Sequence, residues 1–72
     1  MSRGILFKFG RKVREARIRA ELSQEDLAER AGVHRTYVGM IERGEKNITL
    51  ENIDRILRGL GTTFRDFFHD YY

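Results

Sequence analysis

The chain has 72 residues, enough for one domain and too few for two, and a fold of this size buries only about 60% of its unfolded surface. It contains no cysteine, so disulfides and thiolate metal sites are excluded, and its early apolar stretch at residues 5–7 is too short for a signal peptide or a membrane span. The formal net charge is +3, but residues 1–22 hold seven basic side chains and only two acidic ones, whereas the rest of the chain is slightly acidic. A basic excess at one end fits a polyanion partner, either nucleic acid or a membrane surface, and equally an ordinary solvated helix face.

Apolar residues recur at helical spacing along the whole chain, and strand-like alternation is absent. The pattern predicts five helices, over residues 6–21, 24–31, 35–43, 50–60 and 64–70. Helix-ending glycines and N-cap hydroxyls mark the boundaries, namely Gly32, Gly44, Gly61, Ser23, Thr49 and Thr63. We therefore predict an all-α fold, with residues 1–72 forming one compact five-helix domain.

The second and third predicted helices form a close pair within residues 23–44. Ala28 is small enough to let the two helices approach each other, and Gly32 permits the sharp turn between them. Val33 and Ile41 supply apolar contacts that fix the crossing angle. Because the second helix of such a pair protrudes far enough to enter the DNA major groove, this segment predicts a helix-turn-helix.

The sequence resembles the phage-repressor-like helix-turn-helix regulators, the XRE or Cro/C1 family. The resemblance covers nearly the whole chain and is carried by Arg17 and by residues 20–24, 27–33, 35–38, 41–44 and 50–61. Within the family, the stretch HRTYVGMIERGEKNITLENI is most similar to the controller proteins of restriction–modification systems.

This resemblance implies a cytoplasmic, sequence-specific regulator of transcription that binds double-stranded DNA as a homodimer on a pseudo-palindromic operator. RNA polymerase is a further candidate partner, and no cofactor or small-molecule ligand is expected. An antitoxin or a phage-type repressor with the same domain is the alternative, although only the short aromatic tail is available to bind a toxin.

Individual residues receive roles from the resemblance and from their own chemistry. The base-reading positions on the third helix are Arg35, Thr36, Tyr37 and Met40. Contacts with the DNA backbone are predicted for Gln24, His34, Arg43, Lys46 and Asn47. The family pairs an arginine with a glutamate across the first and third helices, and Arg17 and Glu42 match them. Arg35 can donate two hydrogen bonds to guanine O6 and N7; a phosphate clamp or a solvated side chain is the alternative.

Some positions leave more than one interpretation open or depart from the family pattern. Tyr37 can reach a phosphate or the groove wall, or pack against the second helix. Gly39 lowers the stability of its helix by about 1 kcal/mol relative to alanine. Either a close approach of DNA at this position or tolerance of a suboptimal residue would explain why a glycine is present. Glu21 replaces a helix-ending glycine, His34 replaces a capping Ser or Thr, and Ile18 lies on a face that is normally polar. At Glu21 we expect a longer or strained turn after the first helix. At His34 we expect a poor cap of the third helix, and at Ile18 a contact surface.

The predicted fourth and fifth helices, within residues 49–70, are expected to complete the core and to mediate dimerisation. Five aromatic side chains crowd the last nine residues, more than a short helix can bury. Phe64 and Phe67 are predicted to face inward, and the predicted dimer interface consists of Phe68, Tyr71 and Tyr72. A disordered tail, or an interface at the Ile18 face, is the alternative.

Other classes of protein find little support. No nucleophile–base–orienter set or phosphate-binding loop is present, and no carboxylates or histidines stand at metal-ligand spacing. Residues 4–19 would form a basic amphipathic helix of the kind that binds membranes, but its apolar stripe is better explained by burial in the core. We therefore predict no enzymatic activity, no metal site and no membrane partner.

Overall fold

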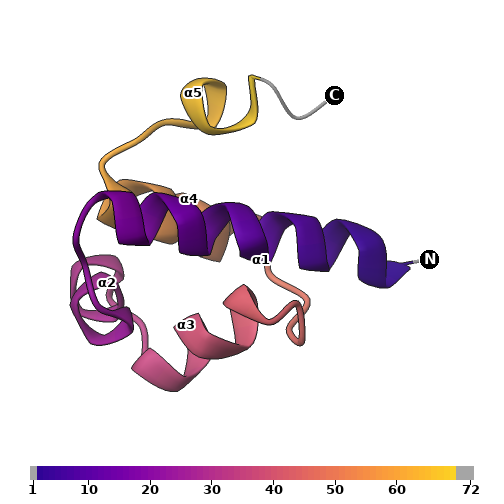
Figure 1. Cartoon of the computed structure of the whole chain (residues 1–72), viewed down its shortest axis with the longest axis horizontal. Coiled ribbons are helices and arrows are strands. Elements are labelled where there is room, and N and C mark those ends of the chain that lie inside the picture. The colour runs from indigo at the N-terminus through magenta and orange to yellow at the C-terminus, as the bar shows by residue number, and fades with distance from the viewer. Residues whose placement is uncertain (1, 70–72) are drawn as a thin grey trace.

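The computed structural model describes residues 2–69, and over this range the chain forms five α-helices and no β-strand. They are α1 (Ser2–Arg19), α2 (Gln24–Ala31), α3 (Arg35–Glu42), α4 (Leu50–Leu60) and α5 (Phe64–Phe68). α1 runs the length of the molecule in Figure 1, with α5 above it and α2 and α3 below it. The predicted all-α class and helix-turn-helix are confirmed. None of the described helices is long and apolar enough to cross a membrane.

Three helix–helix contacts build the core. α1 packs against α3, and α2 packs against both α3 and α4. Gly10 makes the first contact possible, because a Cβ there would lie 2.2 Å from the carbonyl oxygen of Ile41. Gly59 does the same for α4, where a Cβ would lie 2.9 Å from Leu27 Cδ1. The buried apolar side chains around these contacts are Phe9, Val13, Leu27, Ala28, Ala31, Val38, Ile41, Ile56, Leu57 and Phe67.

The helix caps follow the predicted boundary residues. Ser23 and Asp26 form a reciprocal capping box at the start of α2: the Asp26 N–H donates to Ser23 Oγ (2.9 Å), and the Ser23 N–H donates to Asp26 Oδ2 (3.0 Å). The hydroxyls of Thr49 and Thr63 cap α4 and α5. Left-handed glycines end α2 and α4, and a third lies in the turn after α3.

α1 differs from its predicted bounds at both ends. It begins at Ser2 rather than residue 6, and its Ile5 and Leu6 line a groove together with Asn47 and Ile48 of the loop after α3. It ends at Arg19 rather than Glu21, because Glu21 adopts a left-handed conformation (φ 62°) that glycine would adopt at less cost. The turn is closed by hydrogen bonds from the N–H groups of Glu21 and Leu22, so it is strained and not lengthened.

The prediction that Phe64 faces inward is wrong. α5 has only five residues, and its Phe67 and Phe68 rings fill the space against Phe9, with centroid separations of 5.7 and 6.0 Å. Phe64 is left 40% exposed and stacks on Phe68. α5 ends at Phe68; Asp70, the predicted end, lies outside the described residues.

Candidate nucleic-acid interface

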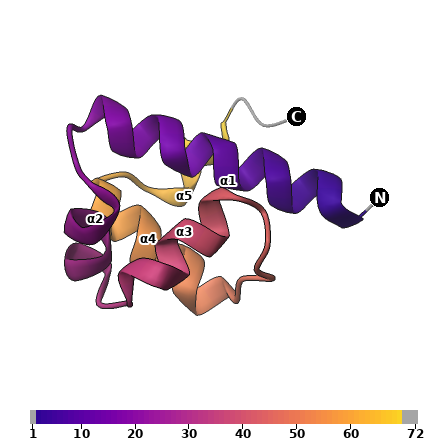
Figure 2. The same ribbon diagram turned by 60° about the horizontal axis from the view of Figure 1, so that its bottom comes forward.

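α3 has one face in the core and one in solvent, and it lies on the near surface of the molecule in Figure 2, in front of α4. Val38, Ile41 and Glu42 are buried. Arg35 and Thr36 are exposed in the first turn, and Met40 is half-buried one turn later. Three of the predicted base-reading side chains therefore share the outer part of one short helix. α3 ends at Glu42, one residue before its predicted end, and Arg43 is its C-cap.

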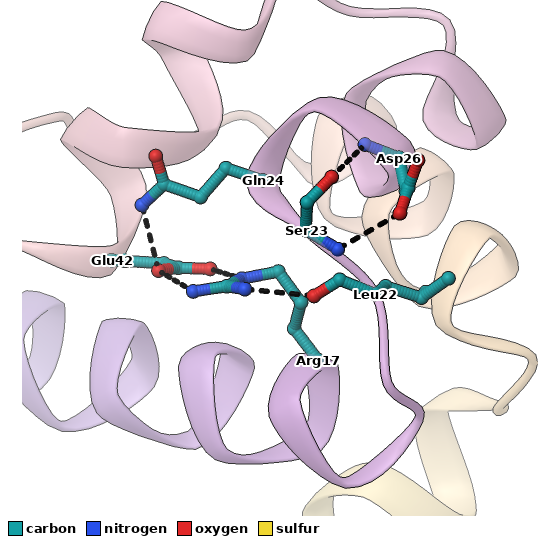
Figure 3. A network of polar contacts seen from close by, with 6 residues as sticks. All are labelled: Arg17, Leu22, Ser23, Gln24, Asp26 and Glu42. Atoms are coloured by element: carbon teal, nitrogen blue, oxygen red, sulfur yellow. Dashed lines mark hydrogen bonds and ion pairs between the residues drawn. The ribbon is translucent and has the colours of Figure 1, made fainter.

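A polar network holds α3 against the two preceding helices (Figure 3). Arg17 Nε donates to Glu42 Oε2 (2.6 Å), and Arg17 Nη2 donates to Glu42 Oε1 (3.1 Å). A third hydrogen bond runs from Arg17 Nη1 to the carbonyl oxygen of Leu22 (2.8 Å). The side-chain hydrogen bond to Glu42 raises the pKa of Arg17, so the guanidinium is charged at neutral pH. The Glu42 side chain is only 2% exposed, so this pair joins α1 to α3 in a site that excludes water.

Gln24 extends the network to α2. Its Nε2 donates to Glu42 Oε1 (3.0 Å), which leaves the second amide proton available to another acceptor. Its side chain also lies beside Gly39, where a Cβ would be 3.5 Å from Gln24 Oε1 and 3.1 Å from Arg43 Nη1. A Cβ at position 39 would therefore make ordinary contact with Gln24 and would require the end of the Arg43 side chain to move by a few tenths of an ångström.

His34 caps α3, and the expectation of a poor cap is wrong. Its Nδ1 accepts a hydrogen bond from the N–H of Thr36 (3.0 Å), as the side-chain oxygen of Asn or Ser does at this position. The extended conformation of His34 (φ −80°, ψ 146°) places the ring within reach of that N–H. Because Nδ1 accepts, the neutral ring carries its proton on Nε2, which can donate to a phosphate.

Tyr37 is held by a hydrogen bond from α4. Its half-buried ring packs against the core, and its hydroxyl accepts a hydrogen bond from Asn52 Nδ2 (2.9 Å). Sequence reasoning missed Asn52, since a polar residue two positions after the start of a helix has no signal that sets it apart from a solvated side chain.

The loop after α3 presents Arg43, Lys46 and Asn47, all exposed. Arg43 Nε lies 3.1 Å from Glu45 Oε2, and this contact raises the pKa of Arg43. Both side chains are more than half exposed, so the pair is screened by solvent and Arg43 can exchange Glu45 for a phosphate at little cost.

An apolar patch lies away from α3, on α5 and the starts of α1 and α4. Its exposed members are Leu50 (73% exposed), Ile5 (48%) and Phe64 (40%), and Leu50 and Phe64 line one shallow hollow. Phe68 and Ile5 line an adjoining groove of about 270 Å³. Of the predicted interface residues, Phe68 is half-buried at this patch, and Tyr71 and Tyr72 lie outside the described residues. Ile18, half exposed on the outer side of α1, is separate from the patch.

Within residues 2–69, no group of histidines and carboxylates is arranged to hold a metal ion. The chemistry that this surface offers is hydrogen-bond donation and positive charge, from Arg35, Thr36, Arg43 and Lys46, on a convex helix. Such a surface suits the edges of bases and the phosphates of a groove wide enough to admit a helix.

Comparisons with known proteins agree with this geometry. Residues 13–67 match the family model described as helix-turn-helix. The chain is 43% identical to the control protein C.BamHI of Bacillus amyloliquefaciens over 67 residues, covering 92% of this chain and 83% of that protein. It is 39% identical to the control protein C.MunI of Mycoplasma sp., covering 92% and 90%.

Solved structures give the same result. The restriction–modification controller protein C.AhdI from Aeromonas hydrophila is 43% identical, with a TM-score of 0.86 over 90% of this chain and 98% of that one. The controller protein C.Esp1396I, solved as a tetramer in complex with its natural 35 base-pair operator, is 33% identical, with a TM-score of 0.86 over 89% and 84%.

Proposed function

This chain belongs to the helix-turn-helix family of the XRE or Cro/C1 type, and on that premise we propose that it is a sequence-specific DNA-binding regulator of transcription, a controller of a restriction–modification system. The single observation that supports this most strongly is the position of α3. Its inner face is fixed by Arg17, Glu42 and Gln24, and its outer face presents Arg35 and Thr36 to solvent.

In the proposed complex α3 enters the major groove. Arg35 donates to guanine, and Thr36, Tyr37 and Met40 contact neighbouring base edges or the groove wall. Gln24, His34, Arg43, Lys46 and Asn47 contact phosphates on either side and fix the register of the helix. Regulation then requires an effect on RNA polymerase at the promoter, either by exclusion or by direct contact.

We further propose that the chain acts as a homodimer through the apolar patch. One recognition helix reads only a few base pairs, whereas two copies related by a two-fold axis read half-sites about 34 Å apart. Leu50, Ile5 and Phe64 offer exposed apolar surface that a second copy would bury, and Phe68 continues it. The C.Esp1396I tetramer on its operator supports an assembly of several copies on DNA for this chain also.

The experiment that tests DNA binding is selection of duplexes from a random-sequence library by the purified chain, followed by fluorescence anisotropy on the selected duplex. We expect a two-fold symmetric consensus, and log affinity that falls with log salt by about 0.9 per phosphate contact. Lys46→Ala should weaken binding to selected and random duplexes alike and reduce that slope by about 1. A library that returns no consensus, or binding that does not respond to salt, would contradict the proposal.

The dimer is tested by sedimentation of Leu50→Glu at micromolar concentration, with Ile18→Glu as the matched control. Both positions expose large apolar side chains, but only Leu50 lies on the patch. We expect Leu50→Glu to be monomeric and Ile18→Glu to remain dimeric. The reverse result would place the interface on the outer side of α1.

The gene context tests the biological assignment. We expect genes for a restriction endonuclease and a methyltransferase beside this one, and a toxin gene in their place would favour an antitoxin.

A further inference from the structure

Asn52 joins α4 to the recognition helix. It lies in the first turn of α4, where its backbone N–H donates to the Oγ1 of the N-cap residue Thr49 (3.1 Å). This cap fixes the backbone of Asn52, and its side-chain Nδ2 then donates to the hydroxyl oxygen of Tyr37 (2.9 Å). The two residues are half-buried, so the hydrogen bond is partly protected from water.

This hydrogen bond determines what the Tyr37 hydroxyl can do. A phenol has one proton, and its oxygen here accepts the proton of Asn52, so its own proton points to another acceptor. The ring cannot turn freely, because it packs against the core. Tyr37 therefore presents a fixed hydrogen-bond donor, which suits acceptors in DNA: a phosphate oxygen, or guanine O6, guanine N7 or thymine O4 in the major groove.

We propose that Asn52 is a positioning residue for DNA recognition, which holds the Tyr37 hydroxyl in place and oriented as a donor without contacting DNA itself. The inference rests on the proposed function. Its physical basis is preorganisation: a side chain already held in its bound geometry loses less conformational freedom when DNA binds.

A double-mutant cycle tests this with the full chain. Affinities are measured for wild type, Asn52→Ala, Tyr37→Phe and the double variant, on the duplex selected by wild type and on a random duplex. We expect Asn52→Ala to weaken binding about fivefold, the usual effect of one hydrogen bond, and to have no further effect once Tyr37→Phe has removed the hydroxyl. Glu51→Gln, exposed on the same turn of α4, is the control and should not weaken binding.

The two duplexes identify the acceptor. A loss confined to the selected duplex means that Tyr37 donates to a base, and an equal loss on both means that it donates to a phosphate. The proposal is overturned if Asn52→Ala leaves affinity unchanged, or weakens binding as much in the Tyr37→Phe background as in wild type. Failure of wild type to select any duplex would instead contradict the proposed function.

A spectroscopic measurement on the free protein needs no DNA and no stable Asn52 variant. The side-chain amide resonances of Asn52 should shift in Tyr37→Phe, which removes the acceptor, and should stay in place in Glu51→Gln. Unchanged resonances in Tyr37→Phe would show that the hydrogen bond is absent in solution and would overturn the proposal.

Discussion

The two ends of α3 are held in different ways. In its last turn, Glu42 is buried against Arg17, and the backbone of Ile41 and Glu42 packs against Gly10 of α1. In its first turn, Arg35 and Thr36 are exposed, and the His34 cap is the side-chain hydrogen bond that holds the backbone there. The buried end fixes where the helix lies, and the exposed end is free to carry side chains chosen for their chemistry. Changes at the buried end should therefore alter stability, and changes at the exposed end should alter DNA recognition.

The largest effect is expected at the buried ion pair. Arg17→Met or Glu42→Leu alone should lower the free energy of unfolding by about 3–5 kcal/mol, because each leaves a buried charge without its partner. The double variant Arg17→Met with Glu42→Leu should lose less than either single change. Urea unfolding of the three variants gives the values, and strictly additive losses would contradict direct pairing.

A methyl group at Gly10 should have the next largest effect. Gly10→Ala places a Cβ 2.2 Å from the carbonyl oxygen of Ile41, which is backbone and cannot move without shifting α3. We expect a loss of about 1–3 kcal/mol in the free energy of unfolding, as for other overpacked sites. Gly4→Ala is the matched control, since a Cβ at Gly4 has open space around it and should not destabilise. Equal melting temperatures for the two variants would show that α1 and α3 are not this close.

The His34 cap at the exposed end of α3 should contribute less to stability. His34→Ala should cost about 1 kcal/mol of stability, and His34→Ser, which restores an accepting oxygen, should cost little. If His34 also contacts a phosphate, both variants should bind DNA more weakly. Thermal melts and anisotropy on the same samples separate the two roles, and a His34→Ala variant as stable as wild type would contradict the cap.

The smallest effect concerns the cap of α2 and depends on pH. Hydrogen bonds from the backbone and side chain of Ser23 lower the pKa of Asp26 below its usual value. The stabilisation is therefore present above the pKa of the unfolded state and is lost as pH falls through the lower, folded-state pKa. We expect Asp26→Asn to lower the melting temperature slightly at pH 7, with the difference from wild type shrinking as pH falls below about 4. A difference that stays constant from pH 7 to pH 3 would contradict this account.

Helix periodicity and capping residues predicted most of this fold from sequence. α2 and α4 begin and end where the pattern indicated. α3 and α5 begin where it indicated, but α3 ends one residue early and α5 ends at Phe68 instead of residue 70. The misses come from contacts between distant residues. The first residues of α1 bring Ile5 to a groove shared with Asn47 and Ile48, and the close approach of α1 to α3 depends on the absence of a side chain at Gly10.

The candidate site was predictable to a similar extent. Residues on the outer face of α3 follow from helical spacing and from the family pattern. Asn52 could not be found this way, because its partner Tyr37 lies fifteen residues earlier on another helix. Phe64 was predicted wrongly for a related reason: the last nine residues contain more aromatic rings than a short helix can bury, and only packing decides that Phe64 faces outward.

The central claim is that α3 reads DNA sequence from its exposed end while its buried end only holds it in place. Arg35→Ala tests this most directly, with affinity measured by anisotropy on the selected duplex and on random duplexes, and stability measured by urea unfolding. We predict a loss of about 1–3 kcal/mol in binding to the selected duplex, a much smaller loss on random duplexes, relaxed preference at one base pair per half-site, and stability within about 0.5 kcal/mol of wild type. Equal losses on both kinds of duplex would mean that Arg35 clamps phosphate, and would contradict the claim.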